Sequence, residues 1–316
     1  MKLVSFNVRG LGGTARGKFI RKIIQKEEVQ FICIQEKKRK KKKEVNGKPL
    51  RYYLWGDNDV GWVASPSIGH AGGLLCMCDS NYFLLKNEFG GRGYVGLEGL
   101  WKDKERDVVI INIYAPNDIE GRRRMWEELR EKKTSSTITC WCLIGDFNCV
   151  KRAYERVGVA GEDENVAERD QFNAFIRDME LEDAPCVGRK FTWYRPNGRA
   201  RSKLDRMMTT RDWFTMWPGS TQYILDRNIP DHCPIFVKNN CVDWGPKSFK
   251  VLDYWFSDKK FSKYVESWKA IRCEGWGACT KRKAKRIEKI SKSVELGAFW
   301  KLGKKRITYF KPIELD

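Results

Sequence analysis

The first 240 residues contain a series of short apolar runs, each ending in or bounded by polar residues that can bind a metal ion or a phosphate. These segments are SFNVRG (5–10), CIQEK (33–37), INIYAPN (111–117), LIGDFN (143–148), SKLDRM (202–207) and IPDHCPI (229–235). Short runs rich in Val, Ile, Phe and Cys, bounded by Gly, Pro, Asn or Asp, are typical of β-strands. Strands are therefore expected at 2–7, 31–35, 73–78, 108–114, 140–146, 190–194, 203–209 and 233–237.

Three helices are expected between these strands, because apolar residues recur there at helical spacing. The expected apolar faces are Phe19, Ile23 and Ile24 in 15–27, Met125, Trp126 and Leu129 in 121–132, and Phe172, Phe175, Ile176 and Met179 in 165–180. Strands that alternate with helices indicate a mixed α/β sandwich.

The composition of the chain changes near residue 239. Apolar residues make up 41% of the chain and aromatic residues 13%, which is enough for a substantial core. The segment after residue 240 is aromatic and basic, lacks turn-separated strands, and has a Lys/Arg-rich helical stretch from about Thr280 to Lys301. We therefore expect a folded domain at 1–240 and a basic, partly helical extension at 241–316.

The chain is strongly basic, with a formal charge of +20. Such a surface attracts polyanions, of which nucleic acid is the commonest inside cells. Residues 241–316 carry 19 basic and nine acidic residues, and 37–43 is a run of seven consecutive basic residues directly after Glu36. That run is either a solvated loop or a phosphate-facing patch, and the sequence leaves both open.

The cysteines and the hydropathy pattern point to an intracellular protein. Eleven cysteines without an export signal favour reduced thiols over a disulfide framework. Cys76 and Cys78, like Cys140 and Cys142, are expected to be buried thiols on one face of a strand. No apolar run approaches the roughly 20 residues that span a bilayer. We expect a nuclear or cytoplasmic protein that does not bind membranes.

The polar residues at the strand ends form a candidate catalytic set, because strand ends at one edge of a sheet converge. Mg²⁺ prefers carboxylate and amide oxygens, so Glu36, with Asn7 and Asp231, is the expected metal site. The other expected roles concern the phosphate. Asp146 orients or deprotonates the attacking water, Asn148 and Tyr114 contact the phosphate, and His232, oriented by Asp205, stabilises the developing negative charge. Taken singly, each such residue is more often a turn former, a surface residue or a packing residue than a catalytic one. His70 is expected in a loop.

In this order and context the motifs resemble the endonuclease/exonuclease/phosphatase superfamily of Mg²⁺-dependent phosphodiesterases, over roughly residues 1–238. The resemblance implies a four-layer α/β sandwich of two packed mixed β-sheets flanked by helices, here followed by the basic helical extension. It also implies Mg²⁺ as cofactor, with Mn²⁺ as an alternative, and no small-molecule cofactor. The matching positions are Asn7, Glu36, Tyr114, Asp146, Asn148, Asp205, Asp231 and His232.

Within the superfamily, the chain is most similar to the endonuclease domain of plant LINE-type non-LTR retrotransposons. The motifs that carry this similarity are SFNVRGL (5–11), AGGLLC (71–76), GDFN followed by Glu155-Arg156, and GRKFTWYRPNGRARSKLDR (188–206). The segment DWGPKSFKVLDYW after residue 240 resembles the connector that leads to reverse transcriptase in such proteins. The resemblance implies a monomeric enzyme that nicks double-stranded DNA.

Two other functions stay open. Many repair-type members of the superfamily carry an Asp where this chain has Arg9, which weakens the alternative of an apurinic/apyrimidinic repair endonuclease. The charge alone would also fit a non-catalytic nucleic-acid-binding remnant, but the intact set of eight residues favours an enzyme.

The hairpin from Thr192 to Lys203 is the expected specificity element. Arg195, Arg199 and Arg201 flank Pro196-Asn197-Gly198, which is a strong turn signal. A loop at this place probes the DNA minor groove in the endonucleases that the chain resembles, and arginine suits readout of groove width. A solvated basic turn is the alternative. The expected DNA-contacting residues are Arg9, Lys37, Arg195, Arg199, Arg201 and Ser202.

Overall fold

The computed structural model describes residues 1–8, 10, 14–37, 44–45, 48–56, 60–65, 73–158, 166–227 and 231–239. All of them belong to one compact unit, Met1–Cys241. The predicted extension 241–316, the predicted loop at His70, Arg9 and residues 38–43 of the basic run lie outside the described residues.

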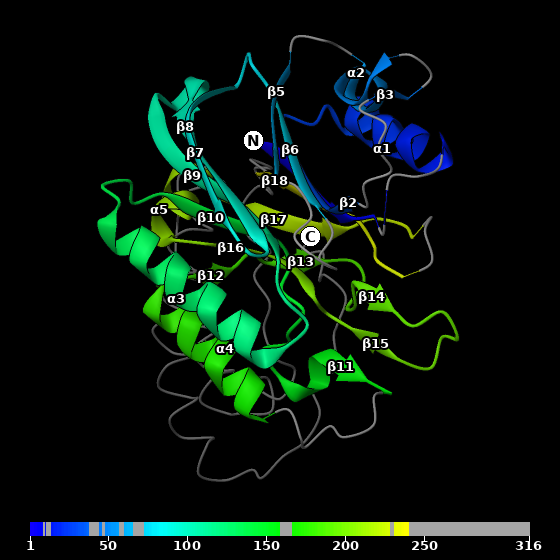
Figure 1. Ribbon diagram of the computed structural model, residues 1–316, viewed down its shortest axis with the longest axis vertical. Coiled ribbons are helices and arrows are strands. Elements are labelled where there is room, and N and C mark those ends of the chain that lie inside the picture. Colours follow the sequence, from blue (N-terminus) through cyan, green and yellow to red (C-terminus); the bar gives the residue numbers. More distant parts are fainter. Residues whose placement is uncertain are drawn as a thin grey trace, which may run out of the picture. The chain divides into compact units, whose positions relative to one another are not determined.

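Two mixed β-sheets form the centre of this unit (Figure 1). Sheet I has, in spatial order, β13 (Cys186–Val187), β17 (Ser220–Ile224), β18 (Ile235–Asn239), β1 (Lys2–Asn7), β2 (Phe31–Lys37), β6 (Gly73–Asp79) and β5 (Val60–Ser65). Sheet II has β12 (Glu182–Asp183), β16 (Asp205–Thr209), β10 (Trp141–Asp146), β9 (Arg106–Tyr114), β8 (Tyr94–Trp101) and β7 (Phe83–Gly91).

Two smaller sheets complete the described strands. Sheet III consists of β11 (Arg156–Val157), β15 (Arg201–Ser202) and β14 (Trp193–Tyr194), and a two-stranded sheet pairs β3 (Glu44–Val45) with β4 (Lys48–Pro49). The helices are α1 (Thr14–Glu27), α2 (Leu50–Trp55), α3 (Ile119–Ser135), α4 (Val166–Asp178) and α5 (Arg211–Met216), with short 3₁₀ turns at Lys102–Lys104 and Ala153–Glu155.

The domain has four layers, which are separated by three clusters of buried apolar side chains. The central cluster lies between the sheets and joins residues of sheet I, such as Cys33 and Cys76, to residues of sheet II, such as Leu97 and Ile110. A second cluster packs α3 and α4 on the outer face of sheet II, where the two helices lie side by side in Figure 1. A third packs α1 and α2 on the outer face of sheet I. The predicted four-layer α/β sandwich is confirmed.

The three predicted apolar helix faces are also confirmed, with one difference of degree. Ile23 and Ile24 of α1 are buried and Phe19 is half-buried, whereas the predicted stripes of α3 and α4 are fully buried. α3 begins where the Asp118 side chain accepts a hydrogen bond from the Gly121 N–H, because an N-cap oxygen satisfies an otherwise unpaired backbone donor.

The strand predictions were incomplete in sheet II. The strand prediction missed β7 and β8. β8 contains Gly96 and Gly99, and glycine weakens a strand signal. In the fold these glycines make room for aromatic rings from β7. A Cβ on Gly96 would meet the ring of Phe89, and one on Gly99 would meet the ring of Phe83. β5 and β17 were also not predicted, and the predicted strand 190–194 is reduced to Trp193–Tyr194.

The thiols of the central strands lie in the core between the sheets, as was predicted for Cys76, Cys78, Cys140 and Cys142. Cys33, Cys76, Cys78, Cys140 and Cys142 are all buried and free there, and burial raises the pKa of Cys78 to about 12. Such thiols are unreactive packing residues. Within the described part of the chain, no helix combines the length and the apolar character needed to cross a membrane.

Candidate active site

Three predicted site residues lie in one row across sheet II. β9 and β10 are parallel and pair Tyr114 with Asp146, and β10 and β16 are antiparallel and pair Asp146 with Asp205. Residues paired in register point to the same face of a sheet. Tyr114 and Asp146 end their strands and Asp205 begins its strand, so the three polar groups lie together at one end of these strands. Gly145 allows β9 and β10 to approach here, because its φ is 147° and a Cβ would lie 2.0 Å from the Ile113 carbonyl oxygen.

A second group of predicted site residues lies at the facing edge of sheet I. Asn7 ends β1 and pairs with Gln35 of the parallel strand β2. Asp231 and His232 lie a few residues before β18, which pairs with β1. The Asn7 Nδ2 atom donates a hydrogen bond of 2.9 Å to Asp146 Oδ2. This bond joins the two edges, so residues separated by 139 positions in the sequence share one site.

His232 lies between two buried carboxylates. Its Nδ1 is 2.9 Å from Asp205 Oδ2, and its Nε2 is 3.7 Å from Asp146 Oδ2. The three side chains and Asn7 are all at most 4% exposed, so water screens these interactions little. With Nδ1 donating to Asp205, the Nε2–H is directed to the side where Asp146 lies.

The two carboxylates and the imidazole shift one another's protonation. Burial alone would lower the pKa of His232, but the charges of Asp205 and Asp146 outweigh it and raise the pKa to about 9. Burial raises the pKa of Asp146 to about 6, against the opposing charge of His232. At neutral pH the imidazole is therefore protonated and the Asp146 carboxylate is ionised but readily accepts a proton.

The loop after β10 fixes Asp146 and contains Asn148. The Asn148 backbone N–H donates to Asp146 Oδ1 at 2.9 Å, and the Asn148 side chain donates to the Ala115 carbonyl at 2.6 Å. Asn148 has a φ of 48°, a left-handed conformation that Asn tolerates better than most residues. Its carboxamide thus links the ends of β9 and β10, next to Tyr114, which is half-buried.

Thr192 is a site residue that the sequence analysis named only as the start of a hairpin. Its Oγ1 accepts hydrogen bonds from the backbone N–H groups of Leu204 (3.0 Å) and Asp205 (2.9 Å), and its carbonyl accepts one from Cys233 at 2.7 Å. Thr192 is fully buried. Thr192 therefore holds the backbone on both sides of the Asp205–His232 pair in place. The sequence Phe191-Thr192-Trp193 contains no motif that would predict this role.

A buried ion network supports the same strand. Arg206 follows Asp205 and contacts the Glu155 carboxylate, and it also lies 3.3 Å from Asp183 Oδ2. Lys151 also belongs to the network, because its Nζ lies 2.9 Å from Asp183 Oδ2. These contacts explain the Glu155-Arg156 part of the motif: Glu155 connects the loop after β10 to β16.

The predicted DNA-contacting residues divide into three groups. Arg195, Arg199 and Arg201 are exposed on the hairpin of sheet III. Ser202 is buried, so its side chain does not lie on the face that carries Arg201. Arg9 lies outside the described residues. The backbones of Glu36 and Lys37 belong to β2, but their side chains are also outside the described part.

Potential metal ligands are present in the site. One ligand atom each of Asp146, Asp205 and His232 lies within 4.8 Å of the others. Each Asp146 oxygen accepts one N–H hydrogen bond and keeps a second lone pair, so this group of side chains could itself hold a metal ion. Asp231 is buried beside His232 and adds another carboxylate at this edge. Asn7 and Asp231 thus provide the oxygen type that Mg²⁺ prefers.

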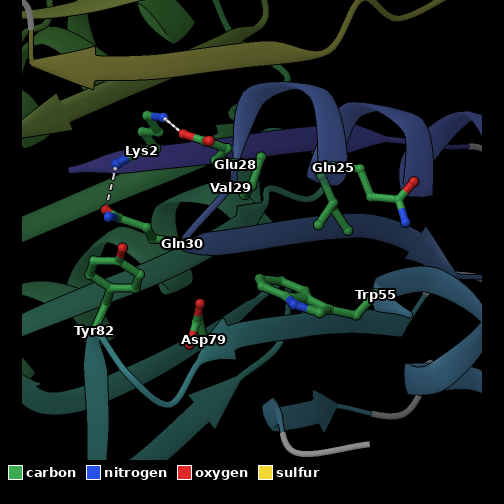
Figure 2. A pocket seen from close by; sticks show the side chains of 9 residues that line it. Lys2, Gln25, Glu28, Val29, Gln30, Trp55, Asp79 and Tyr82 are labelled. Carbon is green, nitrogen blue, oxygen red and sulfur yellow. Dashed lines mark hydrogen bonds and ion pairs between the residues drawn. The ribbon is translucent and has the colours of Figure 1, made fainter. Parts of the chain in front are cut away.

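A crevice, shown in Figure 2, lies at the other end of sheet I. It measures about 370 Å³ and is bounded by Lys2, Glu28, Gln30, Trp55 and Tyr82, among others. Lys2 begins β1 and Asn7 ends it, so the crevice is about 17 Å from the site at about 3.3 Å per residue. Its charged groups Lys2 and Glu28 pair with each other, as Figure 2 shows.

Comparison with known proteins gives consistent similarities. No family model matches the chain. An exodeoxyribonuclease of Bacillus subtilis (strain 168) is 24% identical over 269 residues, which cover 74% of this chain and 98% of that protein.

Three solved structures are similar over about three quarters of the chain. The 3′ phosphatase NExo from Neisseria, bound to product DNA hairpin, has a TM-score of 0.58 and 14% identity, and the match covers 76% of this chain and 99% of that chain. The endonuclease domain of TRAS1, a telomere-specific non-LTR retrotransposon, has a TM-score of 0.53 and 14% identity, with 75% of this chain and 96% of that chain covered. The AP endonuclease LMAP from Leishmania major has a TM-score of 0.54 and 15% identity, with 75% of this chain and 86% of that chain covered.

At these identities the similarities establish the fold. The chain has the fold of the endonuclease/exonuclease/phosphatase enzymes, as its motifs predicted.

Proposed function

We propose that the chain is a divalent-metal-dependent DNA endonuclease that nicks one strand. The observation that carries the proposal is the row Asp205–His232–Asp146, in which a protonated imidazole lies between two buried carboxylates and Asn7 joins the row to sheet I. Buried carboxylates with shifted pKa values beside an imidazole provide a base and a stabilising charge within one site.

The residues suit hydrolysis of a phosphodiester. Asp146 takes a proton from a water molecule whose oxygen attacks phosphorus, the bond from phosphorus to O3′ breaks, and O3′ leaves as a hydroxyl after gaining a proton from solvent. The products carry a 3′-hydroxyl and a 5′-phosphate. His232, kept charged by Asp205, donates a hydrogen bond to a non-bridging oxygen and stabilises the added negative charge.

A metal ion would be held by Asn7, Glu36 and Asp231. These residues supply carboxylate and amide oxygens, and Mg²⁺ is preferred over softer metals by such donors, with Mn²⁺ as a substitute. Bound there, the ion would neutralise charge on the phosphate as the P–O bond breaks.

Double-stranded DNA is the proposed substrate, and a retrotransposon is the proposed origin. Three exposed arginines of the hairpin, Arg195, Arg199 and Arg201, flank the site, and the similarity to the TRAS1 endonuclease domain supports both points. The exodeoxyribonuclease similarity also concerns DNA cleavage.

A plasmid assay tests the proposal. The full chain with supercoiled plasmid and Mg²⁺ is expected to give open circles, and the Asp146→Ala, His232→Ala double variant is expected to give none. Equal nicking by the wild type and the double variant, with Mg²⁺ or with Mn²⁺, would overturn the proposal.

An apurinic/apyrimidinic repair endonuclease is the second candidate, and the similarity to the AP endonuclease LMAP favours it. It predicts that a duplex with one abasic site is cut much faster than the same duplex with an intact base. Equal rates on the two duplexes select the retrotransposon-type nicking enzyme.

A further inference from the structure

A row of alternating cations and aromatic rings lies on the surface beside sheet III. Arg152 and Lys190 each contact the Tyr154 ring, at 5.7 and 5.0 Å from its centroid. Lys190 also contacts the Phe191 ring at 5.3 Å, and Arg201 contacts the same ring at 4.9 Å. The order is thus Arg152, Tyr154, Lys190, Phe191, Arg201, and we call it the cation–aromatic ladder.

The ladder is an open surface. Arg152, Lys190 and Arg201 are exposed, and Tyr154 is 54% exposed, which is unusual for a large aromatic side chain. Only Phe191 is buried, and it anchors the ladder to the domain. Arg152 also donates a hydrogen bond to the Tyr154 hydroxyl, so the cation and the ring hold each other in place.

Among the described residues, the cations of the ladder form no direct ion pairs, although the charges of Glu155 and Asp183 act on Arg152 from a greater distance. In the described part of the chain, no carboxylate lies within ion-pairing distance of Arg152, Lys190 or Arg201. Three described carboxylates of neighbouring segments are bound to other cations. Glu155 and Asp183 bind Arg206, and Asp226 binds Arg189 at 2.6 Å.

Three neighbouring cations repel one another, and this repulsion lowers the free energy of unfolding. Each exposed cation–π contact raises it by only about 0.5–1 kcal/mol. The arrangement therefore contributes little to stability and leaves a fixed, positively charged strip. Such a strip binds a polyanion with little ordering cost, because its side chains are already held.

The ladder is continuous with the active site. The segment of Arg152 and Tyr154 follows the loop that contains Asn148, Phe191 precedes Thr192, and Arg201 is on the strand that leads to Asp205. Trp193, two residues after Phe191, forms a backbone bridge with His232. The strip and His232 are therefore carried by segments that are adjacent in the fold.

We propose that the cation–aromatic ladder is a second DNA-binding surface, which binds the phosphate backbone of the duplex beside the cleavage site. This inference rests on the proposed endonuclease function and adds Arg152, Tyr154 and Lys190 to the arginines of the hairpin tip. We assign it the role of positioning the duplex through its phosphates, because most protein–DNA hydrogen bonds, including many from Arg and Lys, go to the backbone.

The test compares two double variants of the full chain that each remove two positive charges. One is Arg152→Gln with Lys190→Gln. The control is Arg123→Gln with Arg124→Gln, on an exposed face of α3 where both arginines pair with Glu120. Binding to a fluorescent DNA duplex is measured in EDTA from 50 to 200 mM salt, and nicking kinetics are measured with Mg²⁺.

For the ladder variant we expect the salt slope of log K to fall by about 2, since each phosphate contact contributes about 0.9. Its KM for nicking should rise on the order of tenfold with kcat unchanged, because phosphate contacts position the duplex without acting on the reacting bond. The control should match the wild type. An unchanged slope and KM in the ladder variant, or an equal loss in the control, overturns the proposal.

A pair of tyrosine variants tests the ring itself. Tyr154→Leu keeps every charge, so we expect an unchanged salt slope and two- to fivefold weaker binding, on the order of one exposed cation–π contact, and Tyr154→Phe should restore affinity. Wild-type affinity in Tyr154→Leu contradicts the role of the ring. A wild type that binds DNA but never nicks it refutes the endonuclease function and leaves the ladder supported by binding alone.

Discussion

The side-chain amide of Gln35 donates a hydrogen bond of 2.7 Å to Oδ1 of Asn112, across the interface between the two sheets. Both residues are fully buried. Gln35 lies beside Asn7 in sheet I, and Asn112 is two residues before Tyr114 in sheet II. The bond therefore fixes the distance between the two halves of the candidate site. Gln35 also donates to Ser5 Oγ, and Asn112 donates to the Ile34 and Leu75 carbonyls.

Replacing Asn112 with Leu, which has a similar shape, should lower the free energy of unfolding by about 1–3 kcal/mol, because Gln35 and two backbone carbonyls lose partners in a dry core. Chemical denaturation measures this. Asn87 is the matched control, since it is exposed and its bond to Glu98 is at the surface. Asn87→Leu should change stability by no more than about 0.5 kcal/mol. Equal effects at the two positions would show that the inter-sheet bond contributes nothing.

The rate of nicking should depend on pH with two limbs. As the pH falls through about 6, Asp146 gains a proton and can no longer accept one from water, so the rate should fall. As the pH rises through about 9, His232 loses its proton and with it the charge that stabilises the phosphate, so the rate should fall again. Values of kcat/KM between pH 5 and 10 measure both limbs.

The Asp205→Asn variant identifies the upper limb. Asp205 raises the pKa of His232, so its neutralisation should move this limb to lower pH while the rate also drops. Asp107→Asn is the control, because Asp107 is only half-buried and pairs with Lys86. An upper limb that stays in place in Asp205→Asn would show that His232 is not the group that titrates.

Thr192 should affect catalysis without contacting DNA. Thr192→Val keeps the shape but leaves the buried N–H groups of Leu204 and Asp205 without an acceptor, which should cost about 1–3 kcal/mol of stability. We expect kcat to fall and KM to stay the same, because the Asp205–His232 pair loses its position while the exposed arginines do not move.

Thr192→Ser restores the hydroxyl and should recover most of the activity and stability. If Thr192→Ser were as impaired as Thr192→Val, the methyl group and not the hydrogen bonds would be responsible for the effect.

Arg206 should be among the most sensitive positions in the domain. Arg206→Met removes the cation from a buried network and leaves Glu155 and Asp183 facing each other without it, which should cost about 3–5 kcal/mol. Thermal or urea unfolding measures the loss. Arg92→Met is the control, since Arg92 is exposed and its distance to Asp118 is 3.9 Å, so its effect should be at most about 1 kcal/mol. Similar losses at Arg206 and Arg92 would refute the structural role of the network.

Local pattern predicted the elements that carry the site. The runs ending in Asn7, Tyr114 and Asp146 have the short, apolar, turn-bounded form of strands, and each is a strand in the fold. The strands that escaped prediction, such as β8, have glycines whose purpose is visible only where rings from a neighbouring strand fill the space. The roles predicted for the site residues remain predictions, and for Glu36, Arg9 and Lys37 the structure does not describe the side chains.

The sequence alone determined the residue types of the site, because strand-end carboxylates, amides and one histidine have chemistry that does not depend on their partners. Only the tertiary structure decided the protonation states of these residues and the contacts that hold them in position. His232 is protonated because two carboxylates from distant strands lie on either side of it, and Asp146 has a raised pKa because it is buried. Thr192, Asn112 and Arg206 support the site through hydrogen bonds and ion pairs to residues 12 to 78 positions away, and such contacts leave no periodic signal in the chain.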